Sequence, residues 1–501
     1  SFCDCYVYSE VERVWQIVKG DLAGSFGTHG GANSAPVRRV LTGTSGIGKS
    51  VAAGAYLLYQ LLHYDAEQLP TVAYFVADTA FLFDKATKTM SSFPYSPPAI
   101  ESFLEVATRT RGYIICDVMW GKQQTLSVKL PPAGWGMLVV LPPGEARFRE
   151  WEDEMGARRI VMDCPDESDV TAMCTWLVRE CPAEEKAEYW EDFQKGMALL
   201  GPIQRNVLRG YWHELASRLQ GAMERLSTWA VNCYVGLDKT NLWRCRVPTE
   251  DFSKMVRVVT GRGTECFQNA PASAAVRADV LVRVARAMRT RAGFMTVLMP
   301  HHVLLPSAVW VHAVGAFMYP GFVGRMRRKL RELRSPTGRE PRPCLLQTNP
   351  RLRPTDAVAL RPKVLHPGKV DANYRVLYVP GVENFPLMDA FFFVAAPRRT
   401  MVGLQTTTAK ARRVATDTVR QFNEQLAEFF EGWKKFARGL SWEIIYVQRA
   451  DSVTINAWQE CKNAGDRASA EDKWHRTFWD NEVRQYHMAI SHEDAIAVCS
   501  A

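Results

Sequence analysis

Residues 41–50 read LTGTSGIGKS, and this stretch decides the fold of the first half of the chain. Gly43, Gly48, Lys49 and Ser50 fill the pattern G-x-x-x-x-G-K-[ST] of a phosphate-binding loop. Glycines let backbone N–H groups converge on a phosphate, and the following helix points its positive end at it. The lysine neutralises phosphate oxygens and the hydroxyl is placed to bind Mg²⁺. The stretch predicts a nucleotide site, and an ordinary glycine-rich turn is the alternative.

The residues expected to hold ATP or GTP include the loop, the start of its helix and one distant arginine. They are Gly43, Thr44, Gly46, Gly48, Lys49, Ser50, Val51 and Arg205. We expect Ser50 and Asp117 to hold Mg²⁺, and Lys49 and Asp117 to be the catalytic pair. Arg205 closes the stretch GPIQR, where a Gly-Pro turn brings it to a helix start. It either offers a cation to the nucleotide or is simply surface charge.

The segments around the loop predict a buried parallel sheet. Continuous apolar runs, rather than alternating ones, are typical of strands covered on both faces. The predicted strands are residues 36–43, 71–78, 112–117, 135–141 and 158–164. A helix is predicted over 49–64, and helical patterning from a cap at Asp166 or Ser168 to about Trp229 predicts a lid.

Asp117 ends the run YIICD, and a carboxylate at the end of a neighbouring buried strand is where this fold class holds Mg²⁺. A strand-end turn is the alternative explanation. Two features argue against fast hydrolysis. Val118 stands where many ATPases carry a glutamate, and the strand ending at Leu141-Pro142 lacks a polar residue to sense the γ-phosphate. Binding is therefore better supported than turnover.

Composition narrows the class of protein. The 501 residues carry a net charge of +9, which favours an acidic or nucleic-acid partner, with a mildly basic surface as the alternative. The 12 cysteines show no zinc-binding spacing and suit a reduced compartment. The start of the sequence has no signal-peptide pattern. The most apolar region, 293–324, is interrupted by prolines and histidines, so buried helices are expected there rather than a membrane span.

A second candidate site lies near the C-terminus. Strands are predicted over 374–379, 387–394 and 400–408, followed by a helix over 416–438 and a strand over 442–448. This order matches the core of restriction-endonuclease-like nucleases, in which an Asp and an E-x-K motif hold a divalent cation.

Here Asp389 is kept, but Gln405 and Thr407 replace Glu and Lys, and Lys410 is off the expected position. We expect Asp389, Gln405 and Thr407 to share one face of the sheet, with too little charge for robust cleavage. A sheet with one Asp at a strand end is the alternative.

Residues 325–363 hold twelve Lys or Arg and three Asp or Glu. The resulting charge of +9 equals the net charge of the whole chain. Such a strip is suited to a DNA or RNA backbone, although a solvated helix, RMRRKLRELR, followed by a flexible linker is also consistent. The candidate nucleic-acid contacts are Arg325, Arg327, Arg328, Lys329 and Arg331.

Both candidate sites occur in one family. The stretches GIGKS, AGAYLLYQLLHYDAEQLP, GYIICDV, FQNAP, VGLQTTTA and SWEIIYVQ resemble the retrotransposon hot spot proteins of trypanosomes, from about Val11 to His492. That family is similar to the Crinkler effectors, whose plan is a P-loop NTPase followed by a nuclease-like domain. The resemblance implies ATP or GTP binding, a nuclear or perinuclear location, with a cytoplasmic one left open, and protein partners in chromatin or transcription.

The predicted architecture is an α/β chain with four segments. They are an AAA+/STAND-like P-loop core (1–165), a helical lid (166–230), a mixed linker domain (231–371) and a restriction-endonuclease-like domain (372–501). The leading hypothesis is a weak, Mg²⁺-dependent NTPase associated with nucleic acid. The competing one is a non-catalytic scaffold that binds nucleic acid or protein and carries a degenerate nuclease-like domain.

Overall fold

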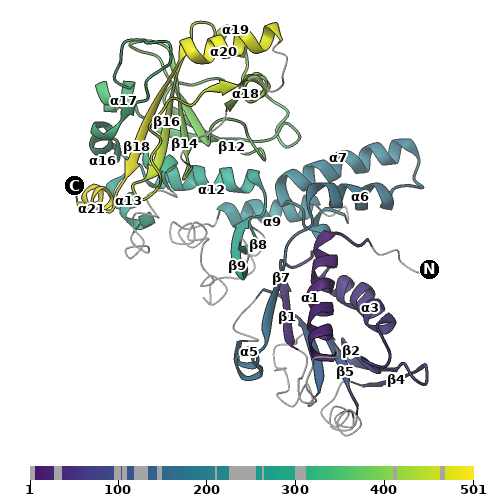
Figure 1. The fold of residues 1–501 in the computed structure, drawn as a ribbon. Coiled ribbons are helices and arrows are strands. Elements are labelled where there is room, and N and C mark those ends of the chain that lie inside the picture. Colours follow the sequence, from purple (N-terminus) through teal and green to yellow (C-terminus); the bar gives the residue numbers. More distant parts are fainter. Residues whose placement is uncertain are drawn as a thin grey trace. The chain divides into compact units, whose positions relative to one another are not determined.

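The computed structural model describes residues 6–26, 37–94, 103, 110–117, 134–143, 149–208, 212–224, 255–261, 264–298, 312–409, 414–462 and 469–500. It divides the chain into two compact units (Figure 1). Unit 1 comprises Ser1–Ala216 and Leu237–Ala270, and unit 2 comprises Ser217–Gly236 and Pro271–Ala501. Both units are α/β, and each contains a seven-stranded sheet.

The sheet of unit 1 has the order β4-β3-β2-β5-β6-β1-β7. Its strands are β1 (Arg38–Gly43), β2 (Thr71–Val76), β3 (Thr79–Asp84), β4 (Thr89–Pro94), β5 (Gly112–Asp117), β6 (Trp135–Val140) and β7 (Arg158–Met162). The five predicted strands became β1, β2, β5, β6 and β7, and all pairings among these five are parallel. The antiparallel hairpin β3–β4 at the edge was not predicted.

Both faces of the parallel part of this sheet are largely buried, as the continuous apolar runs predict, whereas the edge strand β4 is mostly exposed. One face packs against α1 (Ser9–Phe26) and a helical run made of α2 (Lys49–Val51), the π-helical η1 (Ala52–Leu57) and α3 (Leu58–His63). The other face packs against residues that include Trp151 of α5 (Arg149–Met155) and Val258 of β8 (Val256–Gly261). Figure 1 shows α1 and α3 together on one side of the strands and α5 on the other.

The predicted lid forms a small helical layer. Its helices are α6 (Glu167–Leu177), α7 (Ala183–Leu200), α8 (Gln204–Val207) and α9 (Trp212–Glu224). Asp166, one of the two predicted caps, begins α6 in a capping box with Asp169. Val170, Cys174, Phe193 and Val207 form a separate core under α6, α7 and α8.

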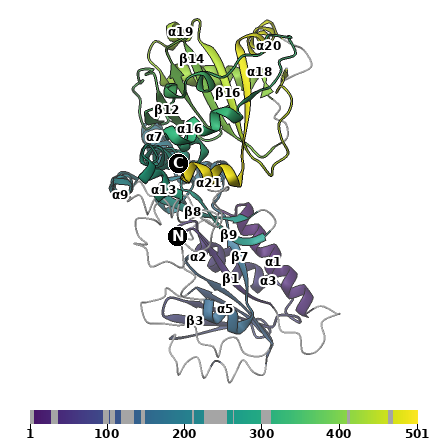
Figure 2. The ribbon, with the colours of Figure 1, turned by 90° about the vertical axis from the view of Figure 1, so that its left-hand side faces the viewer.

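The compact units divide the chain differently from the predicted segments. The predicted linker domain, 231–371, is split between the two units at residues 270 and 271. Strands β8 and β9 (Thr264–Pro271) form a separate two-stranded sheet, and β8 lies against β1 and β7 (Figure 2). The reason is that β8 makes specific polar contacts with unit 1, which are described below.

The sheet of unit 2 has the order β10-β18-β16-β14-β13-β12-β11. Its strands are β10 (Arg331–Glu332), β11 (Asp356–Leu360), β12 (Val376–Pro380), β13 (Ala390–Val394), β14 (Thr400–Thr406), β16 (Ser441–Arg449) and β18 (Val483–Ile490). Strands β12, β13 and β14 are antiparallel neighbours, whereas β14, β16 and β18 are parallel. A further pair, β15 (Val414–Ala415) and β17 (Cys461–Lys462), is separate.

Helices α18 (Thr416–Phe429), α19 (Trp433–Phe436) and α20 (Ala470–Glu482) contribute to the aromatic core over one face of this sheet. The predicted helix over 416–438 is thus two helices. Helix α12 (Ala274–Ala287) lies against β11 and β12. The remaining described helices are α13 (Arg291–Leu298), α15 (Ala313–Ala316), α16 (Pro320–Met326), η5 (Arg327–Lys329), α17 (Leu345–Thr348), η6 (Pro350–Leu352) and α21 (His492–Ser500).

Within the described ranges, no helix combines the length and the apolar character that crossing a membrane requires. The apolar region 293–324 contains α15 and most of α13 and α16, and residues 299–311 lie outside the described part of the chain. Its described side chains include buried apolar ones such as Phe294, Phe317 and Phe322.

Candidate functional site

The loop between β1 and α2 has the backbone that its glycines permit. Gly46 and Gly48 both have φ +88, a left-handed conformation that L-residues with a side chain rarely adopt. Gly43 lies so close to β7 that a Cβ would be 2.3 Å from the Met162 carbonyl oxygen. Three of the predicted loop residues are therefore glycine for a physical reason, and the loop is a built feature rather than an ordinary turn.

Lys49 lies over this loop. Its Nζ donates to the carbonyl oxygens of Gly43 and Thr44, each at 2.8 Å. The side chain is buried, and burial, assisted by the nearby Arg205 charge, lowers the pKa of Lys49 to about 8. A buried ammonium held only by neutral oxygens favours an added anion, because such an anion would compensate the desolvated charge.

Ser50 and Asp117 meet at the carboxyl edge of the sheet. The Ser50 hydroxyl donates to Asp117 Oδ1 at 3.2 Å, although β6 separates β5 from the loop strand β1. Burial raises the pKa of Asp117, and the Ser50 hydrogen bond opposes that rise. A hydroxyl and a carboxylate at this spacing are the oxygen ligands that suit Mg²⁺. Val118, the residue after Asp117, lies outside the described residues.

The Thr44 side chain makes contacts that were not predicted, and its expected role toward a nucleotide stays a prediction. Its hydroxyl oxygen accepts from the Val258 N–H at 2.8 Å, and Cys164 Sγ lies 3.6 Å from the same oxygen. Nearby, the Asp163 carboxylate accepts from the N–H and hydroxyl of Thr260 at 2.7 and 2.6 Å. The loop is therefore anchored to strand β8. No motif in the sequence indicated this partner.

Arg205 is brought beside the loop by α8. Its backbone N–H donates to the Gly46 carbonyl oxygen at 3.0 Å, and its Cβ and Cδ approach Gly46. The side chain is exposed, and its charge is close enough to affect the pKa of Lys49. The predicted closeness of this arginine to the loop is present, whereas its role toward a nucleotide stays a prediction.

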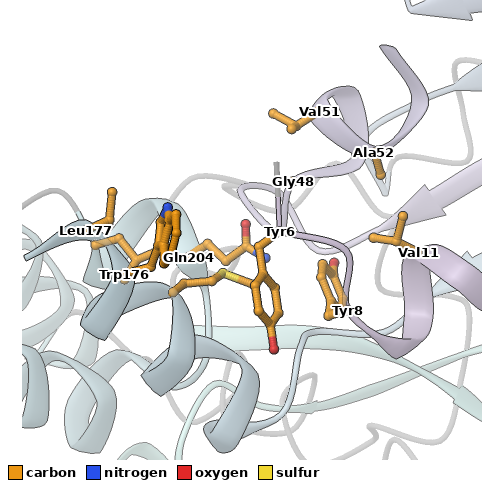
Figure 3. A pocket seen from close by; sticks show the side chains of 11 residues that line it. Tyr6, Tyr8, Val11, Gly48, Val51, Ala52, Trp176, Leu177 and Gln204 are labelled. Carbon is orange, nitrogen blue, oxygen red and sulfur yellow. The ribbon is translucent and has the colours of Figure 1, made fainter. Parts of the chain in front are cut away.

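A cavity of about 510 Å³ begins at the loop (Figure 3). Its lining is mostly apolar and aromatic and comprises Tyr6, Tyr8, Val11, Gly48, Val51, Ala52, Met173, Trp176, Leu177, Gln204 and Leu208. Of these, only Gly48 and Val51 were predicted as site residues. Ala52 follows the loop in η1, and the others come from the segment before α1, from the start of α1 and from the lid, which no local motif connects to the loop.

Asp389 and Gln405, which were expected to share one face of the C-terminal sheet, do not come together. Asp389 is exposed, and its carboxylate accepts from the N–H and hydroxyl of Thr406 at 2.6 and 2.7 Å. Gln405 is buried, and side chains alternate along a strand, so Gln405 and Thr406 point to opposite faces. The expectation that Asp389 and Gln405 share a face is therefore wrong.

The reason is local. Ala390 pairs with Leu404, yet the Asp389 N–H also donates to Leu404 O at 3.0 Å, so two residues oppose one and the alternation is lost. Thr407 lies just beyond β14, and its N–H donates to Val447 O at 3.1 Å. Lys410 lies outside the described residues. Among those that are described, no group of three or more His, Cys, Asp or Glu side chains could hold a metal ion.

The basic strip is folded rather than a flexible linker. Its helical part ends at Lys329, and Arg331 begins a strand that pairs with β18. Arg327 donates to Gln347 O at 3.2 Å, and Lys329 pairs with Asp494 at 2.5 Å. In the described part of unit 2, the exposed side chains of Arg325, Arg328 and Arg331 make no hydrogen bond or ion pair. Only these three of the five predicted contacts are free for a partner.

A glycine loop between a buried parallel strand and a helix, with its lysine and a Ser–Asp pair at the strand ends, defines a P-loop protein, a class that binds nucleotide phosphates. The family model described as "Retrotransposon hot spot protein, P-loop domain" matches residues 40–334. That match covers more than half of the chain, so the chain belongs to the retrotransposon hot spot protein family. Among curated proteins, none matches it.

Proposed function

We propose that this retrotransposon hot spot protein binds ATP or GTP with Mg²⁺ in unit 1 and is a weak NTPase associated with nucleic acid or chromatin. The observation that carries the proposal is the buried Lys49 ammonium over the loop, with Ser50 and Asp117 in contact beside it. Lys49 would neutralise the phosphates, and Ser50 and Asp117 would hold the ion that polarises them. Hydrolysis would be slow because Val118 and Leu141 supply no group to orient water or sense the γ-phosphate.

The strand order supports an AAA+/STAND-like core. Strand β6 lies between the loop strand β1 and the strand that ends in Asp117, and a helical layer follows β7. In that arrangement Arg205 would act as the cation of the lid, reaching the phosphates when nucleotide is bound. The catalytic role of Lys49 and Asp117 belongs to this proposal.

Calorimetric titration of the full chain with ATP and GTP, each with Mg²⁺, tests the site. We expect binding that Lys49→Ala abolishes while circular dichroism shows the variant still folded. Unchanged affinity in that variant would mean that the loop is only a turn. Steady-state hydrolysis with and without DNA or RNA then separates a weak NTPase from a protein that uses nucleotide as a structural ligand.

Association with nucleic acid is supported by the free, exposed Arg325, Arg328 and Arg331. A nuclear or perinuclear location, and protein partners in chromatin or transcription, are what the family resemblance adds. The plan of a P-loop unit followed by a second α/β unit also supports the relation to the Crinkler effectors.

The alternative is a non-catalytic scaffold with a degenerate nuclease-like domain. The succession β12, β13, β14, α18, β16, with β14 and β16 parallel, supports a restriction-endonuclease-like fold for unit 2. The engagement of Asp389 by Thr406, away from Gln405, favours lost cleavage. A plasmid-cleavage assay with Mg²⁺ or Mn²⁺ tests this point: robust cleavage that disappears in Asp389→Ala would make unit 2 an active nuclease.

A further inference from the structure

The cavity beside the loop is lined partly by buried apolar side chains and partly by ones that remain largely open to solvent. Tyr6 is 45% exposed, Trp176 52% and Leu177 55%. In Figure 3, Trp176 and Leu177 of the lid lie on one side of the cavity, Val51 and Ala52 on the other, and Tyr6 between them. A concave, mainly apolar site with exposed aromatic rings is typical of a pocket whose ligand has an aromatic face.

The position of the cavity fixes which part of a ligand can enter it. Gly48 belongs to the phosphate loop, and Val51 and Ala52 lie on the helical run that begins at Lys49; all three line the cavity. A nucleotide whose phosphates rest on the loop would therefore have its base on the cavity side. This step rests on the nucleotide binding proposed above.

Few polar groups of the cavity are free to form hydrogen bonds with the edge of a base. The Tyr8 hydroxyl donates to the Ile47 carbonyl at 2.8 Å, and the Tyr6 hydroxyl lies 3.3 Å from Asp169 Oδ1. Among the lining side chains that the structure describes, Gln204 carries an amide that makes no such hydrogen bond. An amide both donates and accepts, so it suits adenine and guanine alike. Strong discrimination between bases requires polar groups built for one edge.

We infer that this cavity is the nucleobase site and that it holds purines by stacking on Tyr6 and Trp176, with little distinction between adenine and guanine. Stacking on an aromatic side chain tolerates any base, and its strength grows with ring area. The segment before α1 and helix α6 are thus specificity elements of the nucleotide site. Pyrimidine nucleotides bind more weakly because their single ring covers less of the aromatic surface.

Calorimetry of the full chain with ATP, GTP, UTP and inorganic tripolyphosphate, all with Mg²⁺, tests this inference. We expect ATP and GTP to bind within about threefold of each other, and UTP and tripolyphosphate about tenfold or more weakly. Trp176→Ala should weaken ATP binding about tenfold and leave tripolyphosphate binding unchanged, and Trp176→Phe should restore most of the loss. Trp474→Ala is the matched control, because Trp474 is similarly exposed but lies in unit 2.

The outcomes separate the two proposals. If ATP binds equally well to the wild-type chain and to Trp176→Ala, or no better than tripolyphosphate, the base site is refuted while the phosphate site stands. A preference of more than about a hundredfold for ATP or for GTP would refute the shared purine site, because edge recognition would then dominate. If the wild-type chain binds neither nucleotide nor tripolyphosphate, the proposed function itself fails and the base site fails with it.

Discussion

Lys49 is held by two carbonyl oxygens of its own loop, so its charge is positioned before any ligand arrives. The glycines around it make this possible, because a loop that turns back over its lysine needs left-handed backbone at two positions. Of Gly46 and Gly48, Gly48 is the position at which a side chain would disturb ligand binding more. It is the N-cap of α2, lines the cavity and lies beside Gln204.

Gly48→Ala should therefore weaken nucleotide binding while leaving the protein folded. Its Cβ would lie 2.9 Å from Gln204 Oε1, and the backbone has φ +88, which costs an L-residue about 1–2 kcal/mol. We expect about a tenfold loss of affinity by calorimetry. Gly20→Ala in α1 is the control, because its Cβ would meet nothing within 4 Å. An equal effect of both substitutions would contradict this explanation.

At the scale of elements, strand β8 is part of the nucleotide unit because its backbone pairs with a loop side chain. Thr44 Oγ1 accepts the Val258 N–H, Asp163 accepts two bonds from Thr260, and Glu265 of β9 accepts from the Val161 N–H at 2.7 Å. Specific hydrogen bonds thus attach the hairpin β8–β9 to the loop and to β7.

Removing the Thr44 hydroxyl should loosen the hairpin. Thr44→Val keeps the shape of the side chain but leaves the buried Val258 N–H without its acceptor, which costs about 1–3 kcal/mol. Hydrogen exchange over residues 255–261 should accelerate about tenfold or more. Thr42→Val is the control, because the buried Thr42 hydroxyl makes no hydrogen bond. Unchanged exchange in Thr44→Val would show that other contacts hold β8.

At the scale of the whole molecule, the buried histidines in the described part of the chain lie in unit 2. They are His312, His475 and His487. Burial lowers the pKa of His487, and the nearby Arg331 lowers it further. Burial also lowers the pKa of His475. Unit 2 should therefore be sensitive to acid.

The sign of this effect follows from proton uptake. Below about pH 6.5 an unfolded histidine takes up a proton that folded His487 does not. The contribution of His487 to the free energy of unfolding is therefore complete above that pH and is lost as the pH falls. Each histidine contributes a slope of at most about 1.4 kcal/mol per pH unit. Calorimetric melting between pH 7 and 5 should show a smaller decline for His487→Gln. The exposed His366→Gln controls for the substitution, and equal declines in all three proteins would refute the prediction.

The charge of the strip should govern any binding to nucleic acid. If Arg325, Arg328 and Arg331 neutralise phosphates, the logarithm of duplex affinity falls with the logarithm of salt by about 0.9 per contact. Replacing these three arginines with Ser should remove two to three contacts, and each lost contact should reduce the magnitude of that slope by about 0.9. The control is Ser at Arg286, Arg420 and Arg449, each already paired with a carboxylate. A flat slope in the parent protein would remove nucleic acid from the proposal.

The sequence by itself determined the phosphate loop, the five parallel strands of unit 1 and the strands β12, β13, β14 and β16 of unit 2. These features are local, because each depends on glycine positions or on an unbroken apolar run. Only the tertiary structure decided what lies beside them. Strand β8 joins the loop through Thr44, and Tyr6 and Trp176 line a cavity at Gly48 from positions distant in sequence. Asp389 turns to Thr406 because one extra residue opposite Leu404 cancels the two-residue alternation on which its predicted face depended.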